Sequence, residues 1–359
     1  MDLSIKQNQN GFRFGLETEF LLVDAESFRP LWHPDLRFEI LNSALEAIPI
    51  DDFQCSSLKV EPPHRKPSPY IVEGYHVPDP DMNPVDLLPK GVEIRTPICG
   101  SIDECLTSLK TLHARLQFAL KRLGYKAVAL SFHPIHSHFE GPQNKRRHDF
   151  WQWAMKAMLT YGPDVNISVP EKLAERLDVK DLSEKVNYYI PALTALTLSS
   201  PLLEGGLWRI RGRIGKSVRT YHRSVVAPAI EIHPNEGLRL ELKPFEMTPY
   251  LVDYRNYFLL WLALVLDDGL KGRASDQTRV YDMGQIACDG INSETVRKRA
   301  DEVLTRIPDV LGPWGFDCRS IGILRERLQS IRIPADDIVA IFEKEKSVEG
   351  TLRYLSDLI

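Results

Sequence analysis

The sequence predicts an α+β fold, in which helices pack on one face of an antiparallel or mixed β-sheet. Short segments before residue 249 alternate apolar and polar residues with a period of two, which is typical of half-buried strands. The segments "AIEIHP" and "GLRLELKPF" (229–245) predict a hairpin that turns at "NEG". The chain from about residue 249 has helical spacing and no linker divides the sequence, so we expect one domain over residues 1–359.

The first predicted strand is "FRFGLETEFLLVD" (12–24), in which one set of alternate residues is almost wholly apolar. The opposite face carries Glu17 and Glu19, only two residues apart. Because like charges repel, this face either lies in water or holds a cation. The strand taken alone leaves both interpretations open.

The other elements follow in chain order. We expect helices over 36–48, 101–125, 147–160 and two segments within 171–199, and strands over 90–98, 126–134 and 164–170. The helix over 101–125 opens with a capping box formed by Ser101 and Glu104, and it closes on Gly124. The C-terminal part is predicted to be helical over 250–270, 294–307, 320–332 and 335–346.

Two segments read as loops. Residues 61–90 are rich in proline, which disfavours helices and central strands, so we expect a long ordered loop of the kind that often covers a functional site. Residues 204–223 are rich in glycine and arginine, and no other segment is as basic. Glycine and arginine together suit a loop that clamps a small anion.

Composition excludes several classes of protein. A net charge of -4 over 359 residues argues against a general nucleic-acid binder. The longest apolar run, 257–266, is too short to cross a bilayer, and the polar N-terminus has no signal peptide, so we expect a cytoplasmic protein without a membrane partner. Five scattered cysteines indicate neither a disulfide framework nor a zinc site, and no P-loop or GxGxxG motif is present.

Each predicted strand has one apolar face and one polar face. The polar faces of four strands carry five acids, namely Glu17, Glu19, Glu93, Asp164 and Glu241. The same faces carry three cationic residues, Arg95, Arg239 and Lys243. If the strands are neighbours, hard divalent cations such as Mg²⁺ or Mn²⁺ would neutralise the acids better than these side chains alone. The alternative is an outer sheet face in water with ordinary cross-strand pairs.

Four segments resemble the glutamine synthetase and glutamate–cysteine ligase superfamily. "GLETEFLLVD" resembles its first metal-binding strand, and "GVEIRTPI" (91–98) is similar to the glutamate–cysteine ligase strand Glu-(Ile/Phe)-x-Thr-Pro. "LTALTLSSP" (193–201) and "RLELKPFEMTPYLVDYRNYFLLWLALVLDDGL" (239–270) resemble two further family segments. The resemblance covers roughly residues 12–270, and it implies a glutamine synthetase-like catalytic domain with a curved, mostly antiparallel sheet.

The resemblance also implies roles for single residues. It implies two cation sites, one with Glu17, Asp86 and Glu93 and the other with Glu19, Asp164 and Glu241, although either strand-one glutamate could serve either ion. It assigns Arg95, Lys243 and Arg211 to catalysis, and Arg211 and Arg213 to clamping substrate carboxylates. It assigns nucleotide binding to four residues, Asn166, Ser168, Arg239 and Lys243.

The implied activity is an ATP- and Mg²⁺- or Mn²⁺-dependent carboxylate–amine ligase that forms an amide, plausibly γ-glutamyl, through an acyl phosphate. Its partners would be small molecules, and the resemblance allows for a homodimer. Three residues depart from the family pattern: Asp164 and Asn166 replace a His-x-His pair, and Lys243 replaces an arginine. Two alternatives therefore stay open, a guanidino kinase-like phosphotransferase and a catalytically inert binding homologue.

Overall fold

The computed structural model describes residues 11–142, 155 and 158–357, so the helix predicted over 147–160 lies mostly outside the described residues. Its main sheet has the strand order β10-β11-β5-β1-β3-β2, with β4 also paired to β1, and all of these pairs are antiparallel. The strands are β1 (Arg13–Asp24), β2 (Tyr70–Pro78), β3 (Pro84–Arg95), β4 (Tyr125–Val128), β5 (Pro163–Ser168), β10 (Ile230–His233) and β11 (Arg239–Leu242). The predicted α+β fold with an antiparallel sheet is confirmed.

Helices cover the apolar face of this sheet, as predicted. The helix α2 (Ile102–Lys121) packs on β1, β3 and β4, and α7 (Leu251–Leu266) packs on β5. The apolar residues of β1, such as Phe14, Leu16 and Phe20, are fully buried between sheet and helices. Burying one face fixes the register of each strand, because a one-residue slip would turn its apolar side chains to the other face. The polar residues are thereby held on the opposite face.

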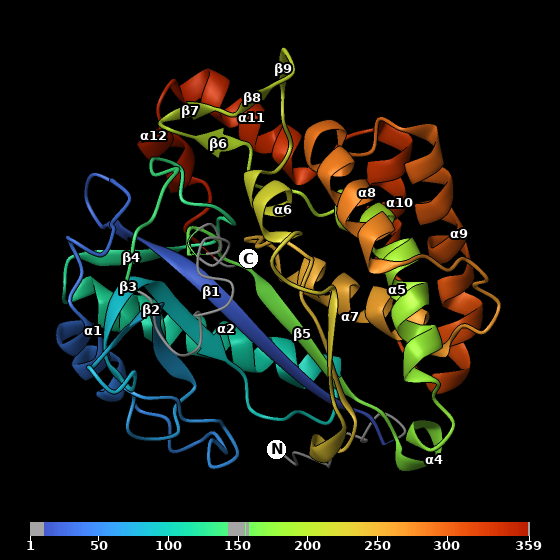
Figure 1. Cartoon of the computed structure of the whole chain (residues 1–359), viewed down its shortest axis with the longest axis horizontal. Helices are drawn as coiled ribbons and strands as arrows, with labels where there is room; N and C mark the ends of the chain where they lie inside the picture. The colour runs from blue at the N-terminus through green and yellow to red at the C-terminus, as the bar shows by residue number, and fades with distance from the viewer. Residues whose placement is uncertain (1–10, 143–154, 156–157, 358–359) are drawn as a thin grey trace, which may run out of the picture.

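The C-terminal part is helical, and Figure 1 shows α5, α8, α9 and α10 gathered on one side of the molecule. The helices other than α2 and α7 are α1 (Phe38–Glu46), α4 (Glu171–Ala174), α5 (Val179–Ala195), α6 (Val218–Arg223), α8 (Asp276–Asp289), α9 (Glu294–Leu311), α10 (Ile321–Ser330), α11 (Pro334–Glu345) and α12 (Val348–Arg353). Sequence analysis missed α8, although the Ser275 hydroxyl caps it by accepting a hydrogen bond from the Thr278 backbone N–H. No described helix has the length and apolar character needed to span a membrane.

The prediction of a loop over 61–90 is wrong, because most of this segment forms the hairpin of β2 and β3. The hairpin tolerates its prolines for positional reasons. The strand β2 lies at the end of the sheet, Pro78 and Pro84 flank the turn, and Pro89 lies opposite Gly74 at a break in the register. A Cβ atom on Gly74 would lie 2.1 Å from the Leu88 carbonyl oxygen, so this position requires glycine.

The basic segment 204–223 contains short strands rather than one open loop. Its end forms α6, and two small hairpins precede it: β6 (Leu202–Leu203) with β7 (Gly206–Leu207), and β8 (Arg209–Ile210) with β9 (Arg213–Ile214). The β8–β9 hairpin projects from the edge of the molecule (Figure 1). This projection separates the arginines of the hairpin from those of α6.

Candidate active site

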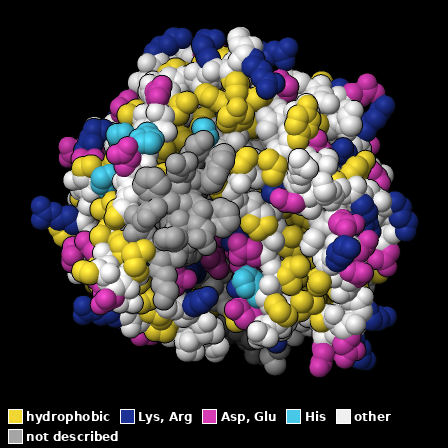
Figure 2. Space-filling model, in the orientation of Figure 1, with side chains coloured by type: hydrophobic (Ala, Val, Ile, Leu, Met, Phe, Trp, Pro, Cys, Tyr) yellow, Lys and Arg dark blue, Asp and Glu magenta, His cyan; other side chains and the backbone are white. Residues whose placement is uncertain are grey.

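The polar faces of the strands line one cavity of about 1130 Å³. Strand pairing sets its charges side by side: Glu19 lies opposite Glu93, and Glu17 lies opposite both Arg95 and Asp164. In Figure 2 acidic, basic and histidine side chains gather at a depression in the middle of one face of the molecule. The cavity is large enough for a nucleotide together with a second small substrate.

Glu17 and Glu93 both line the cavity, and within the described part of the chain neither forms an ion pair. Withdrawal from water, together with the negative charges of Asp164 and Glu241, raises the pKa of Glu17 to about 7. Glu93 is 8% exposed, and burial and the charge of Glu17 raise its pKa well above the usual range. The Asn166 amide donates a long hydrogen bond to Glu17 Oε1 (3.4 Å). Two neighbouring carboxylates withdrawn from water in this way favour a nearby cation.

Glu19 is paired with a lysine that sequence analysis did not identify. Lys90 Nζ donates to Glu19 Oε1 (2.9 Å) and to the Thr160 carbonyl (2.7 Å). The other oxygen of Glu19 accepts a hydrogen bond from the Gly162 backbone N–H (3.0 Å). Glu73, on β2, lies 3.8 Å from Lys90 Nζ. Glu73 falls within the segment predicted to be a loop, so no strand face was expected to carry it.

Lys243 joins the carboxylates on the other side of the cavity. Its Nζ lies 2.9 Å from Asp164 Oδ2 and also contacts Glu241, whose second oxygen accepts from Arg239 Nη1 (2.6 Å). Burial alone would raise the pKa of Glu241, but Lys243 and then Arg239 outweigh burial and lower this pKa to about 2. Arg239 Nη1 also donates to Asn166 Oδ1 (2.6 Å), so these side chains form one network. Ser168 lies opposite Arg239 in the ladder and lines the same cavity.

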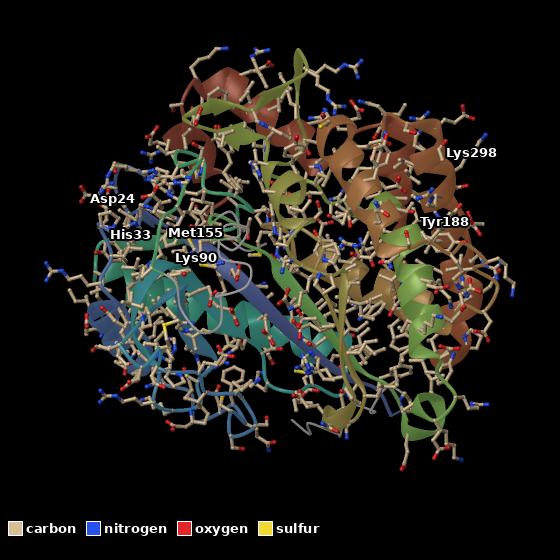
Figure 3. All side chains as sticks on the ribbon, in the orientation of Figure 1. Asp24, His33, Lys90, Met155, Tyr188 and Lys298 are labelled. Carbon is tan, nitrogen blue, oxygen red and sulfur yellow. The ribbon has the colours of Figure 1, made fainter. Side chains whose placement is uncertain are left out.

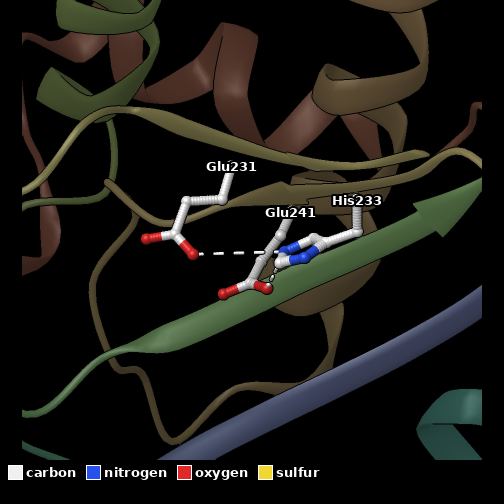
Figure 4. A group of neighbouring side chains, drawn as sticks. All are labelled: Glu231, His233 and Glu241. Carbon is white, nitrogen blue, oxygen red and sulfur yellow. Dashed lines mark hydrogen bonds and ion pairs between the residues drawn. The ribbon is translucent and has the colours of Figure 1, made fainter. Parts of the chain in front are cut away.

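A second group of potential metal ligands lies on the β10–β11 hairpin (Figure 4). His233 Nε2 lies 3.1 Å from Glu241 Oε2 and 4.0 Å from Glu231 Oε2. One ligand atom from each of the three residues lies within 4.8 Å of the others. The alternation in "IEIH" places Glu231 and His233 on the polar face, but sequence reasoning gave them no role.

The structure does not bring Asp86 to the predicted cation site. Asp86 is exposed, and it is absent from the cavity lining. It precedes Glu93 by seven residues of an extended strand with a break in register, so the chain carries it away from the cavity. The carboxylate that does lie beside Glu93 and Glu19 is Glu73.

Arg211 and Arg213 likewise do not line the cavity. Both are exposed near the turn of the β8–β9 hairpin, outside the cavity lining, and Arg213 pairs with Asp289 (3.1 Å). Arg219 and Arg223 of α6 line the cavity instead. Arg219 is 2% exposed, and it donates to the backbone carbonyls of residues 243 and 244 at 3.0 and 3.1 Å.

Arg95 does lie at the cavity, where it is held by the backbone. Its guanidinium donates to the carbonyls of Lys59 (2.7 Å) and Ser68 (2.8 Å). These bonds link β3 to the segment before β2. The guanidinium thereby stays near Glu17, its partner across the β1–β3 pair.

A buried carboxylate, Glu246, holds α6 and was not identified from the sequence. It accepts hydrogen bonds from the Ser199 backbone N–H (2.6 Å), the Ser200 hydroxyl (3.0 Å), the Thr220 hydroxyl (2.7 Å) and the Ser217 hydroxyl. Ser217 is the N-cap of α6. The network therefore ties the end of "LTLSS" to the helix that carries Arg219. The sequence signal that could have revealed Glu246 is the family-like "SSP", because both serines of this segment donate hydrogen bonds to its carboxylate.

Comparisons with solved structures define the class of fold. A glutamate–cysteine ligase of Francisella tularensis, solved in complex with AMP, aligns over 96% of this chain and 88% of its own, with a TM-score of 0.65 and 12% identity. A bifunctional glutathione synthetase from Pasteurella multocida aligns over 97% of this chain and 51% of its own, with a TM-score of 0.60 and 13% identity. The fold is that of the glutamine synthetase-like ligases.

Residues 13–224, more than half of the chain, match glutamate-cysteine ligase family 2 (GCS2), and the chain belongs to this family. This confirms the resemblance found in the sequence. A protein named "Putative glutamate--cysteine ligase 2" in Jannaschia sp. (strain CCS1) is 26% identical over 199 residues, which cover 54% of this chain and 43% of that protein. One of the same name in Thermobifida fusca (strain YX) is 29% identical over 125 residues, 33% of this chain and 30% of that protein. The matched segments thus span less than half the length of these relatives.

Proposed function

We propose that the protein is an ATP-dependent carboxylate–amine ligase. A substrate carboxylate oxygen attacks the γ-phosphorus of ATP, the bond to ADP breaks, and an acyl phosphate forms. The amine nitrogen then attacks the acyl carbon, phosphate leaves, and the amine gives up a proton. The observation that carries this proposal is the pair Glu17 and Glu93, two carboxylates without an ion pair among the described residues, in the cavity of a glutamate–cysteine ligase family chain.

Glu17 and Glu93 fit a hard divalent cation, Mg²⁺ or Mn²⁺. Both offer carboxylate oxygens, which such ions prefer, and burial together with neighbouring acids raises the pKa of each, an effect that a bound cation would oppose. Asp164, Glu241 and Glu19 already have lysine partners. A bound divalent ion would supply charge neutralisation at the phosphates of ATP.

The other cavity residues suit the two substrates. Arg239 on β11 and Lys243 directly after it present cationic groups next to β5, and on β5 Asn166 and Ser168 offer polar contacts for the nucleotide. Arg95 lies across β1 from these residues and can neutralise charge on the transferring phosphoryl group. Planar guanidinium groups suit carboxylates, so we assign the carboxylate substrate to the α6 arginines, Arg219 and Arg223.

The donor we propose is the γ-carboxylate of glutamate, which would make the product a γ-glutamyl amide. The family membership supports this choice, and so do the arginines of α6, because glutamate carries a second carboxylate that needs a cationic partner. Burial of Arg219 strengthens its hydrogen bonds to such a carboxylate by keeping water away.

The test is phosphate release from ATP with Mg²⁺ across a panel of amino acids and amines. We expect release that requires both a carboxylate and an amine, and that is lost in Glu17→Gln but kept in Glu294→Gln, a matched change on the exposed face of α9. ADP formation without free phosphate would identify a phosphotransferase instead. No turnover, together with no rise in melting temperature on adding ATP and Mg²⁺, would identify an inert homologue.

A further inference from the structure

Lys90 is the extra residue of a β-bulge in β3. Glu73 pairs with Gly91 and Gly74 pairs with Pro89, which leaves Lys90 without a partner in the ladder. The Tyr161 hydroxyl donates to the carbonyl that this break leaves unpaired in the ladder (2.8 Å). Bulges of this kind redirect a side chain. Here the redirected side chain lines the cavity, and Figure 3 marks Lys90 over the sheet near β1.

The ammonium group of Lys90 is enclosed by protein. The side chain is 4% exposed, and its Nζ lies 2.9 Å from Glu19 Oε1, 2.7 Å from the Thr160 carbonyl and 3.8 Å from Glu73 Oε1. The ring of Tyr161 packs at 5.4 Å from the same atom. Two of its N–H bonds therefore have acceptors in the protein and a third carboxylate lies nearby, so this ammonium is already engaged by the protein itself.

The acceptors of Lys90 belong to a group that resembles a metal site. Oxygens of Glu19, Glu73 and Glu93 lie within 4.8 Å of one another, which is close enough for one hard cation to contact all three. Lys90 already contacts two of the three, and the second oxygen of Glu19 is engaged by the Gly162 N–H. An ammonium on the chain supplies positive charge there and, unlike a metal ion, cannot dissociate.

We propose that the Lys90 ammonium is a built-in cation that takes the place of one divalent ion at the Glu19–Glu73–Glu93 group. The inference rests on the proposed function, because it concerns how many divalent ions the ligase binds. The protein then binds its divalent ion through Glu17 and Glu93, while Glu19 serves as the counter-ion of Lys90 and not as a metal ligand.

The first experiment counts Mn²⁺ bound per chain, by electron paramagnetic resonance of the free ion, with a non-hydrolysable ATP analogue present. We expect Lys90→Met to bind one more Mn²⁺ than the wild type, because methionine keeps the apolar stem and removes the charge. Lys298→Met, which removes an exposed lysine of α9, should bind the wild-type number. Equal numbers in the wild type and a folded Lys90→Met protein would overturn the inference.

The second experiment does not depend on the Lys90→Met protein folding. In the wild-type background, Glu19→Gln should leave the number of bound Mn²⁺ ions unchanged, whereas Glu17→Gln should lower it. Loss of a Mn²⁺ ion in Glu19→Gln would make Glu19 a metal ligand and overturn the inference, while the proposed function would stand. Absence of Mn²⁺ binding in the wild type and in every variant would overturn both.

Discussion

Glu19 and Glu93 face each other across the antiparallel pair of β1 and β3, although both are acidic. The apolar side chains on the opposite face of each strand enforce this register, since any slip by one residue would expose them. The lysine side chains are spread unevenly over the polar face of the sheet. Lys90 pairs with Glu19 and Lys243 pairs with Asp164 and Glu241, whereas Glu17 and Glu93 form no ion pair among the described residues.

Replacing Glu17 by glutamine should weaken Mn²⁺ binding in the presence of ATP by at least about 100-fold, since changes outside the ligand shell alone often cost 10- to 100-fold. Titration calorimetry with Mn²⁺ measures this loss directly. Asp86→Asn is the matched control, because Asp86 is exposed outside the cavity. A comparable loss in Asp86→Asn would contradict the placement of β3.

The metal-free protein should lose stability through Glu17 as the pH rises. The folded state raises the pKa of this carboxyl from its ordinary 4.5 to about 7, so the folded state binds the proton more tightly than the unfolded state. This contribution is complete below pH 4.5 and is lost as the pH rises through 7, by up to about 3 kcal/mol. Urea denaturation of the wild type and Glu17→Gln between pH 5 and 8, with a chelator, measures the difference.

The comparison with Glu17→Gln is needed because buried histidines change the stability of the fold with pH in the opposite direction. Burial lowers the pKa of His113 to about 4 and that of His133 to about 3, so both destabilise the fold as the pH falls below 6.5. These histidines are unchanged in Glu17→Gln and cancel in the difference. If the difference between the two proteins were independent of pH, the assigned pKa of Glu17 would be wrong.

The alternation of apolar and polar residues was sufficient to predict the sheet and most of its polar face. Glu17, Glu93, Asp164, Asn166 and Glu241 all line the cavity because a period of two fixes the side on which each lies. This argument works wherever the strand is regular. The chemical roles of these five residues stay predictions.

The same argument could not find Lys90 or Glu73. The bulge inserts one residue into β3, and no local pattern in "LLPKGVE" marks which residue is extra. The prolines on both sides of β2 led to a loop assignment, although an end strand tolerates them. Glu246 was missed because its partners Ser199 and Ser217 are distant in sequence and meet only in the folded core.

Lys243→Met should destabilise the protein by about 3–5 kcal/mol, because it leaves the carboxylates of Asp164 and Glu241 without their shared ammonium in a largely buried site. Lys243→Arg keeps the charge and should recover most of this loss. Thermal or urea unfolding at pH 7.5 measures both variants. A Lys243→Met protein as stable as the wild type would show that Arg239 alone compensates these acids.

Arginine substitutions distinguish between the β8–β9 hairpin and α6 as the element that binds the substrate carboxylate. Replacing Arg211 and Arg213 together by alanine should change kcat/KM for the carboxylate substrate by less than about 2-fold, because both side chains are exposed outside the cavity lining. The ion pair of Arg213 with Asp289 lies at the surface, where such pairs contribute little. Arg219→Lys should raise KM at least about 10-fold, because lysine cannot keep both backbone contacts and still offer a planar pair of donors. Steady-state kinetics with the carboxylate substrate varied compares the two proteins. The reverse ranking would place the carboxylate clamp on the β8–β9 hairpin, where the sequence first suggested it.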